Sequence, residues 1–535
     1  MALDLRKIEW GTPDAKQELR TGDGEEYKKL FVTFDDLATT ILPQHLVVWG
    51  GRGCGKSAVA WWLKQQIDSD GMVIPIDFED AEGWVNSALH HVGVLSTVGN
   101  FPTIKFVSDA WYHAIVVELM RRLVSQKYIG ILRGRDVAVR YLKKHSAAKE
   151  DLIQTLAHSL ERVPQLLDGM QGLSQDVIGK SLAVTAKGLL ALESFLTANA
   201  EFTHAESVAF DSVLHADQLE ILVVVDSIDK WLGPVWAPEA REEYMALCQT
   251  VRGLTKALMR LQEGPLHSKV SVKALLPRDM REYIKDRSTE HELHYHHEMQ
   301  WKGQDLAQFV ARRIARGQNL DDPPTLANTW GVLFPDQIEN IATGVRHDPF
   351  EYMLRHSHYR PREILMLCRL LTEHAVRVER AQLKPKEFTR LVHEHSVTQA
   401  KLLLDENRYA YPQVYEAVHK LDGLPPAIER DELFSRLRGV TLPRSAHDLG
   451  DLAQIFYDMG VLGVVTDPRA AEERGLALPY TAFHGERHCF AFRHFARDLT
   501  VAAFDTFIVH PMFFGLLASD AKKDDMTICH NEPME

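Results

Sequence analysis

Short apolar runs alternate with longer amphipathic segments over the first half of the chain, and this pattern predicts an α/β fold. The runs are rich in Val and Ile and end in glycine or acidic residues, which is typical of buried parallel strands. They lie at residues 45–50, 72–78, 219–232 and 270–279. Helical periodicity separates them, so we expect a mainly parallel sheet with helices in its crossover connections.

Changes in this pattern along the chain predict its domains. Residues 452–465 resemble a helix that runs into a small hairpin, and HCFAFRHF at 488–495 supplies a second strand, as in a winged helix. The expected parts are an N-terminal leader at 1–45, an α/β core at 46–318 with a helical insertion at about 104–217, a helical lid at 319–410, a winged-helix-like domain at 411–517 and a tail at 518–535.

Composition narrows the class of protein. The 535 residues exceed one compact core, so several domains are expected. No apolar run approaches the ~20 residues of a membrane span, and the N-terminus lacks the apolar stretch of a secretory signal. Five scattered cysteines form no CxxC pair, which suits a reducing compartment. We therefore expect a cytoplasmic protein that does not bind membranes.

The net charge of -13 argues against a protein that coats nucleic acid regardless of sequence, because such binding needs many Lys and Arg side chains on phosphates. The most basic stretch, residues 120–145, is more simply explained as a solvated helical face than as a DNA contact. DNA binding stays open but is not favoured by charge.

The segment GGRGCGKSA at residues 50–58 satisfies the pattern G-x-x-x-x-G-K-[ST] between a predicted strand and a predicted helix. Its glycines let the backbone wrap round a phosphate, and its N–H groups join a helix N-terminus in facing the negative charge. Lys56 would reach the β- and γ-phosphates, and Ser57 would ligate magnesium. We therefore expect ATP and Mg²⁺ as cofactors, with a glycine turn as the alternative. The expected nucleotide contacts are Gly50, Gly51, Arg52, Gly53, Cys54, Gly55, Lys56, Ser57 and Ala58.

A second site should follow downstream, where an apolar strand delivers a carboxylate to the magnesium. The segment ILVVVDSID provides it. Asp226 ends the strand and is the expected metal-side acid, held through water. Asp229 lies three residues further on, where a carboxylate could orient or deprotonate the attacking water.

Several arginines follow at positions that suit phosphate recognition. Arg278 lies at the tip of a strand, where it could sense the γ-phosphate; an ion pair with Asp279 is the alternative. Arg362, with Arg360, opens a helix in YRPREIL and could stabilise phosphate charge from a lid; an ordinary surface arginine is the alternative. The weakest candidates, as arginine fingers across a subunit boundary, are Arg312 and Arg313.

The 26 histidines do not predict a metal centre. The segment HELHYHHEM fails H-E-x-x-H, because Tyr295 stands where the second ligand is needed. Its period-two alternation suits a strand, and HGERHC is equally weak as a site. Steric fit explains Cys54 better than nucleophilic catalysis, since no histidine is suggested beside it.

Taken in chain order, IEWGTPDAKQE, GGRGCGKSA, VVVDSIDKW, VKALLPRDM, MQWKGQDLAQFVARRI and YRPREIL resemble bacterial P-loop ATPases of the AAA+/STAND class. These share a layout with origin-recognition-type ATPases and often occur in mobile and anti-phage defence loci. The resemblance spans roughly residues 8–420 and implies an ASCE-type P-loop core, a helical lid and a winged-helix-like region. It places Asp229 as the second acid and an arginine of RPRE as a sensor. Ser227 departs from the Asp-Glu of AAA+ motors, and the helical insertion is not implied.

Three functions follow from these expectations. The first is an ATP-hydrolysing switch or assembly subunit, expected as a homo-oligomer in anti-phage defence with an effector protein encoded nearby. The alternative is an initiator- or loader-type ATPase that binds DNA through its C-terminal region. The third is a scaffold that binds nucleotide without hydrolysis. No nuclease, protease or deaminase constellation is visible in the chain.

Overall fold

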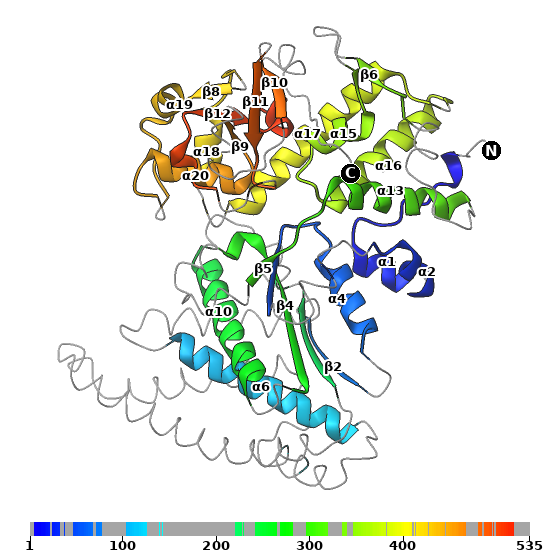
Figure 1. The fold of residues 1–535 in the computed structure, drawn as a ribbon. Helices are drawn as coiled ribbons and strands as arrows, with labels where there is room; N and C mark the ends of the chain where they lie inside the picture. The colour runs from blue at the N-terminus through cyan, green and yellow to red at the C-terminus, as the bar shows by residue number, and fades with distance from the viewer. Residues whose placement is uncertain are drawn as a thin grey trace, which may run out of the picture. The chain divides into compact units, whose positions relative to one another are not determined.

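A computed structural model of the chain describes residues 5–21, 24–32, 37, 46–67, 71–77, 103–125, 139, 142, 220–226, 228, 241–264, 268–281, 296–318, 334–339, 346–380, 382–408, 411, 413–425, 427–443, 446–466, 480–483, 486–494, 496 and 499–517 (Figure 1). Internal contacts divide the chain into two units. We call them the sheet unit (residues 40–49 and 56–298) and the terminal unit (residues 1–39, 50–55 and 299–535). Each is described by itself.

The sheet unit is built on a parallel sheet, as the apolar runs predict. Its five strands are ordered β2-β3-β4-β1-β5, and residues of β1, β3 and β4 are almost all buried. The strand β2 pairs with β3, β3 with β4 and β1 with β5, each in parallel. The strands are β1 (Val47–Gly50), β2 (Met72–Asp77), β3 (Ile221–Asp226), β4 (Val270–Pro277) and β5 (His296–Glu298).

The crossover helices cover both faces of this sheet (Figure 1). The connection from β1 to β2 contains α4 (Lys56–Gln65) and runs along the sheet in one direction. The connections through α6 (Thr103–Ser125) and α10 (Arg241–Glu263) run in the other. Because crossovers are right-handed, α4 lies on one face and α6 and α10 on the other. The connections that leave β1 and β3 therefore cover opposite faces of the sheet, and a ligand is expected at the carboxyl edge near these strands.

The two helices on the second face pack closely. Trp111 Nε1 of α6 donates to the Thr250 carbonyl of α10 at 3.1 Å. A Cβ on Gly253 would lie 2.5 Å from Val107 Cγ1, so only glycine permits this approach. The helical periodicity predicted between the strands is confirmed here by α6 and α10. The remainder of the predicted helical insertion, and most of the basic stretch at 120–145, lies outside the described residues.

The terminal unit contains a helical region and an antiparallel sheet. The helix α13, with buried Leu306, Val310 and Ile314, packs with α2 and α16. The helix α13 belongs to the terminal unit, which includes the chain from Met299 onwards. The helices of this region are α1 (Ala15–Thr21), α2 (Gly24–Leu30), α13 (Gly303–Gln318), α15 (Pro349–Arg355), α16 (Pro361–Arg377) and α17 (Pro385–Asn407), beside a two-stranded sheet of β6 (Ile338–Glu339) and β7 (Arg346–His347).

The antiparallel sheet follows α18 (Val414–His419), α19 (Arg430–Leu437) and α20 (Leu449–Met459). The predicted helix and strand within 452–465 are α20 and β9, and the predicted second strand near 490 is β11. The strands β9 and β11 are antiparallel neighbours. Three further strands extend the sheet to the order β10-β11-β9-β12-β8. The strands are β8 (Ala427–Glu429), β9 (Leu462–Thr466), β10 (Tyr480–Phe483), β11 (Glu486–Ala491) and β12 (Thr506–Val509).

One apolar core underlies the antiparallel sheet and its helices. Phe456, Tyr457, Phe507 and Phe513 belong to one apolar core and are almost fully buried. The predicted tail at 518–535 lies outside the described residues. Among the residues that the structure describes, no helix is both long and apolar enough to cross a membrane.

Candidate functional site

The glycine-rich loop forms the connection between β1 and α4. Its backbone has positive φ at Gly53 (80°) and Gly55 (97°), a region that strains any residue with a Cβ. The helix α4 begins directly afterwards, at Lys56, and its first turn carries no acidic residue. The N–H groups at this helix start therefore face no carboxylate from their own first turn, and they can bind an anion.

Ser57 and Asp226, the two predicted magnesium ligands, lie together in the sheet unit. Ser57 Oγ donates to Asp226 Oδ1 at 3.3 Å, although the residues are 169 positions apart in the chain. Asp226 ends β3 and is only 4% exposed. A hydroxyl and a buried carboxylate are the hard oxygen ligands that suit Mg²⁺, directly or through a water molecule. Asp229, predicted to activate the attacking water, lies outside the described residues.

Arg278, the predicted sensor after β4, pairs with an acid that the sequence does not single out. Arg278 Nε lies 3.3 Å from Glu298 Oε1, and Arg281 Nη1 donates to Glu298 Oε2 at 2.7 Å. Glu298 is 9% exposed and ends β5, in register with Trp49 of β1. The period-two pattern of HELHYHHEM predicts the strand that ends at Glu298, but it does not predict that this acid pairs with Arg278 and Arg281.

Cys54 and Gly55 pack within the terminal unit. Trp301 Nε1 donates to the Cys54 carbonyl at 2.7 Å, and Cys54 Sγ lies 3.9 Å from Met299 Sδ. Cys54 is buried, as is the indole of Trp301. These contacts give the thiol a packing role, in agreement with the steric interpretation of the sequence, and they explain why the segment MQWKG accompanies the loop.

The two arginines of RPRE contact the loop differently. The backbone N–H of Arg362 donates to the Gly53 carbonyl at 3.2 Å, and its Nε donates to the Pro13 carbonyl at 3.0 Å. Arg360 Nη1 donates to the Arg52 carbonyl at 3.2 Å and pairs with Glu406 at 2.9 Å. The exposed Arg362 side chain stays a candidate phosphate sensor, whereas the guanidinium of Arg360 binds the Arg52 carbonyl and the Glu406 carboxylate.

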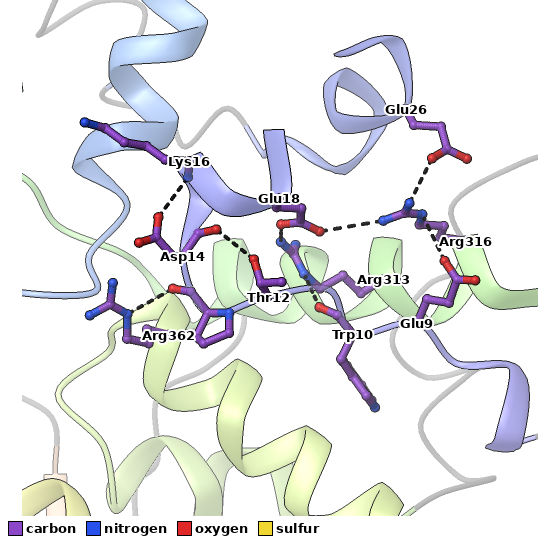
Figure 2. Close-up of polar contacts among 11 residues, drawn as sticks. Glu9, Trp10, Thr12, Asp14, Lys16, Glu18, Glu26, Arg313, Arg316 and Arg362 are labelled. Carbon is purple, nitrogen blue, oxygen red and sulfur yellow. Dashed lines mark hydrogen bonds and ion pairs between the residues drawn. The ribbon is translucent and has the colours of Figure 1, made fainter. Parts of the chain in front are cut away.

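Both candidate arginine fingers of α13 contact groups of the terminal unit. Figure 2 shows Arg313 among its partners. Arg313 is 5% exposed, lies 3.2 Å from Glu18 Oε2 and donates to the Trp10 carbonyl at 3.2 Å. Its guanidinium also lies 3.9 Å from the centre of the Phe309 ring. Arg312 donates to the Phe31 carbonyl. Arg313 thus holds the N-terminal segment at Trp10 and Glu18, whereas Arg312 contacts the residue that follows α2. The sequence does not reveal either role.

That N-terminal segment, IEWGTPDAKQE, is fixed at several points (Figure 2). Trp10 Nε1 donates to Thr372 Oγ1 of α16 at 2.9 Å. Arg316 of α13 lies 3.6 Å from Glu9 and 2.8 Å from Glu26. Gly11 has φ 74°, and a Cβ there would lie 2.1 Å from Glu18 Oε1. Residues far apart in sequence thereby place this segment beside the helix that carries RPRE.

Histidine-rich segments form no metal centre in the part of the chain that the structure describes, where no group of three His, Cys, Asp or Glu side chains could hold an ion. His296 and His297 lie on β5, which confirms the predicted strand. The first residues of HELHYHHEM and the side chains of HGERHC lie outside the described residues.

Comparison with known families identifies one matching region. Residues 304–403 match the model of a FunZ-associated C-terminal helical domain, and a P-loop or AAA+ family model is not among the matches. The region runs from α13 to α17 and includes RPRE. No curated protein matches the chain. What these observations show is a parallel α/β sheet and, after it, a region similar to the FunZ-associated helical domain.

Proposed function

We propose that the protein is a P-loop ATPase whose nucleotide state switches or assembles a complex. One observation carries the proposal: the Ser57 hydroxyl, one residue after the predicted phosphate-binding lysine, meets the buried Asp226 carboxylate at the end of another strand. A chance GKS turn gives no reason for an acid there. In this proposal Lys56 binds the β- and γ-phosphates, while Ser57 and Asp226 hold Mg²⁺.

The finer assignment is an ASCE-type core of the AAA+/STAND class with a helical lid and a winged-helix-like domain. Its support is the motif order in the sequence, the position of β4 between the loop strand β1 and the acid strand β3, and the helical region that matches at 304–403. Bound Mg²⁺ would neutralise charge on the phosphates during hydrolysis. Asp229 is the proposed base or orienting residue for the water, and Arg278 and Arg362 are proposed to sense the phosphate.

A switch role is proposed because the chain carries no second catalytic constellation in its sequence. Its output would then be a change of assembly, either of its own copies or with an effector encoded nearby, in anti-phage defence. Fold alone does not fix such a role. Mass measurement of the protein with and without ATP tests the assembly step: a nucleotide-dependent change in oligomer size is expected, and an unchanged mass in all nucleotide states counts against it.

Phosphate release tests the catalytic assignment. Lys56→Ala should abolish ATP turnover, and Asp226→Asn should reduce it strongly, because the phosphates and the metal lose their ligands. Lys64→Ala, at the other end of the same helix, is the matched control and should retain turnover. Normal hydrolysis by Lys56→Ala removes the assignment. Binding without turnover in the wild type selects the scaffold hypothesis.

The alternative is an initiator- or loader-type ATPase that binds DNA. The observation in its favour is the arrangement of α19, α20 and an antiparallel sheet with the hairpin β10–β11, which is compatible with the winged-helix-like prediction. DNA binding through phosphate contacts weakens steeply as salt concentration rises. A steep salt slope with duplex DNA supports this alternative, and absent or salt-independent binding counts against it.

A further inference from the structure

Two glycines of the loop are not required by the phosphate-binding pattern. G-x-x-x-x-G-K-[ST] fixes only its first and last glycine, whereas Gly51 and Gly53 occupy variable positions. A Cβ on Gly51 would lie 3.0 Å from the Arg360 guanidinium, and one on Gly53 would lie 2.7 Å from Arg362 Cβ. The RPRE turn therefore packs directly on the loop backbone, and this contact explains both glycines.

Arg360 is not free to move away from the loop. Its Nη1 donates to both carboxylate oxygens of Glu406, at 3.1 and 2.9 Å, and to the Arg52 carbonyl at 3.2 Å. Its Nε lies 3.6 Å from Glu363, and the side chain is 11% exposed. Burial acts to lower the pKa of this guanidinium, but the carboxylates of Glu406 and Glu363 outweigh it, and the pKa is raised. Arg360 is thus a permanent cation in a fixed position.

The turn that carries Arg360 is itself held tightly. Tyr359 has φ 54°, which is uncommon for a residue with a side chain and persists only where the surroundings enforce it. Its N–H donates to Ser357 Oγ at 3.2 Å, and its ring stacks on His494 at 4.6 Å. The N–H of His358 donates to Glu363 Oε2 at 2.7 Å. Backbone strain and several side-chain contacts therefore converge on one turn beside the loop.

We propose that Arg360 is a positioning residue for nucleotide binding: held by Glu406 at the end of α17, it fixes the Gly51–Gly53 backbone in the shape that receives the phosphates. The ligand in this inference rests on the proposed function. Arg360 and Arg362 then have different roles. Arg362 is exposed and is the phosphate sensor candidate, whereas Arg360 acts on the loop from behind and does not touch the nucleotide.

Glu406→Gln tests this role with little change of volume. It removes the charge that holds Arg360, so amide hydrogen exchange of residues 50–55 should become faster in the nucleotide-free protein. The affinity for a fluorescent ATP analogue should fall about tenfold, with KM rising and kcat nearly unchanged, because ground-state binding is lost. Arg369→Gln is the control: it breaks an exposed ion pair with Glu373 on the same α16 and should change neither measurement.

A mutant cycle separates positioning from a general loss of stability. Gly51→Ala should weaken ATP binding in the wild type, where Arg360 cannot yield, and should have little further effect in an Arg360→Ala background, where the space is open. If the losses of ATP-binding free energy caused by Gly51→Ala and Arg360→Ala simply add in the double variant, the proposal is overturned. It is also overturned if Glu406→Gln has the same amide exchange rate at residues 50–55 and the same ATP affinity as the wild type. If the wild type binds no ATP, the proposed function fails, and the hydrogen-exchange comparison of nucleotide-free proteins still decides the role of Arg360.

Discussion

Arg313 offers a direct test of a structural role against a catalytic one. The sequence suggests an arginine finger, whereas the structure buries this guanidinium against Glu18, Trp10 and Phe309. Replacing Arg313 with Met keeps much of the apolar stem and removes the charge. The carboxylate of Glu18, only 8% exposed, then loses its nearest cation.

The expected destabilisation is about 3 kcal/mol. At 3.2 Å and an effective dielectric constant of about 20, the gross attraction between Arg313 and Glu18 is about 5 kcal/mol, and desolvation of both ions offsets part of it. Breaking a buried pair by removing one partner typically costs about 3–5 kcal/mol. We expect a cost at the lower end of this range, because Arg316 Nη1 lies 3.6 Å from Glu18 Oε1 and continues to attract this carboxylate. Burial raises the pKa of Glu18, and the two arginines oppose that rise.

Urea unfolding of the full chain, with site-resolved hydrogen exchange over α13, measures this effect. Arg313→Met should unfold at lower urea concentration, and the double variant Glu18→Gln/Arg313→Met should recover part of the loss, since no buried charge is left alone. Arg369→Met, at an exposed ion pair, should change stability by less than about 0.5 kcal/mol. A wild-type stability for Arg313→Met, together with lost ATP turnover, would refute the structural role.

Three further predictions concern the loop and the terminal unit. Ser57→Ala should weaken ATP binding in the presence of Mg²⁺ and leave binding in EDTA nearly unchanged, as titrations of a fluorescent analogue would show; equal loss in both conditions contradicts its role as a metal ligand. Gly53→Ala should destabilise by about 1–2 kcal/mol in urea, because φ is 80° and the new Cβ meets Arg362; an unaffected midpoint argues against this geometry. Burial lowers the pKa of His395 from 6.5 to about 4, so the unfolded chain binds a proton more readily and stability falls as pH drops from 6.5 towards 4. His395→Gln should remove this contribution of His395 to the loss of unfolding free energy at low pH, at most about 3 kcal/mol. An identical pH dependence of unfolding in the variant and the wild type would contradict the assignment.

Local pattern predicted the sheet unit well, because each strand is a short apolar run with a clear end. Val47–Gly50, Met72–Asp77, Ile221–Asp226 and Val270–Pro277 all lie within the predicted runs. Strand β5 is only three residues long and was anticipated from histidine alternation. The C-terminal sheet was predicted in part, since β8 and β12 are short strands that pair with partners distant in the chain, and β10 is a short strand in a hairpin with β11.

The candidate site shows the same limit. Ser57 and Asp226 could be paired from sequence, because a strand ending in an acid is expected wherever a phosphate loop precedes it. The partners of arginines could not be found, since Glu298, Glu406 and Glu18 are acids without a motif. Which carboxylate meets a given arginine depends on helix and strand packing. Arg278, for example, pairs with Glu298 at the end of another strand.

The most direct test of the central claim is equilibrium binding of ATP in the presence of Mg²⁺ to the full-length protein and to Lys56→Ala. We expect the wild type to bind ATP saturably and Lys56→Ala to show no saturable ATP binding. The triphosphate loses its main cation in this variant, while the glycine loop stays intact. Equal binding by the two proteins, or no binding by either, would contradict the account.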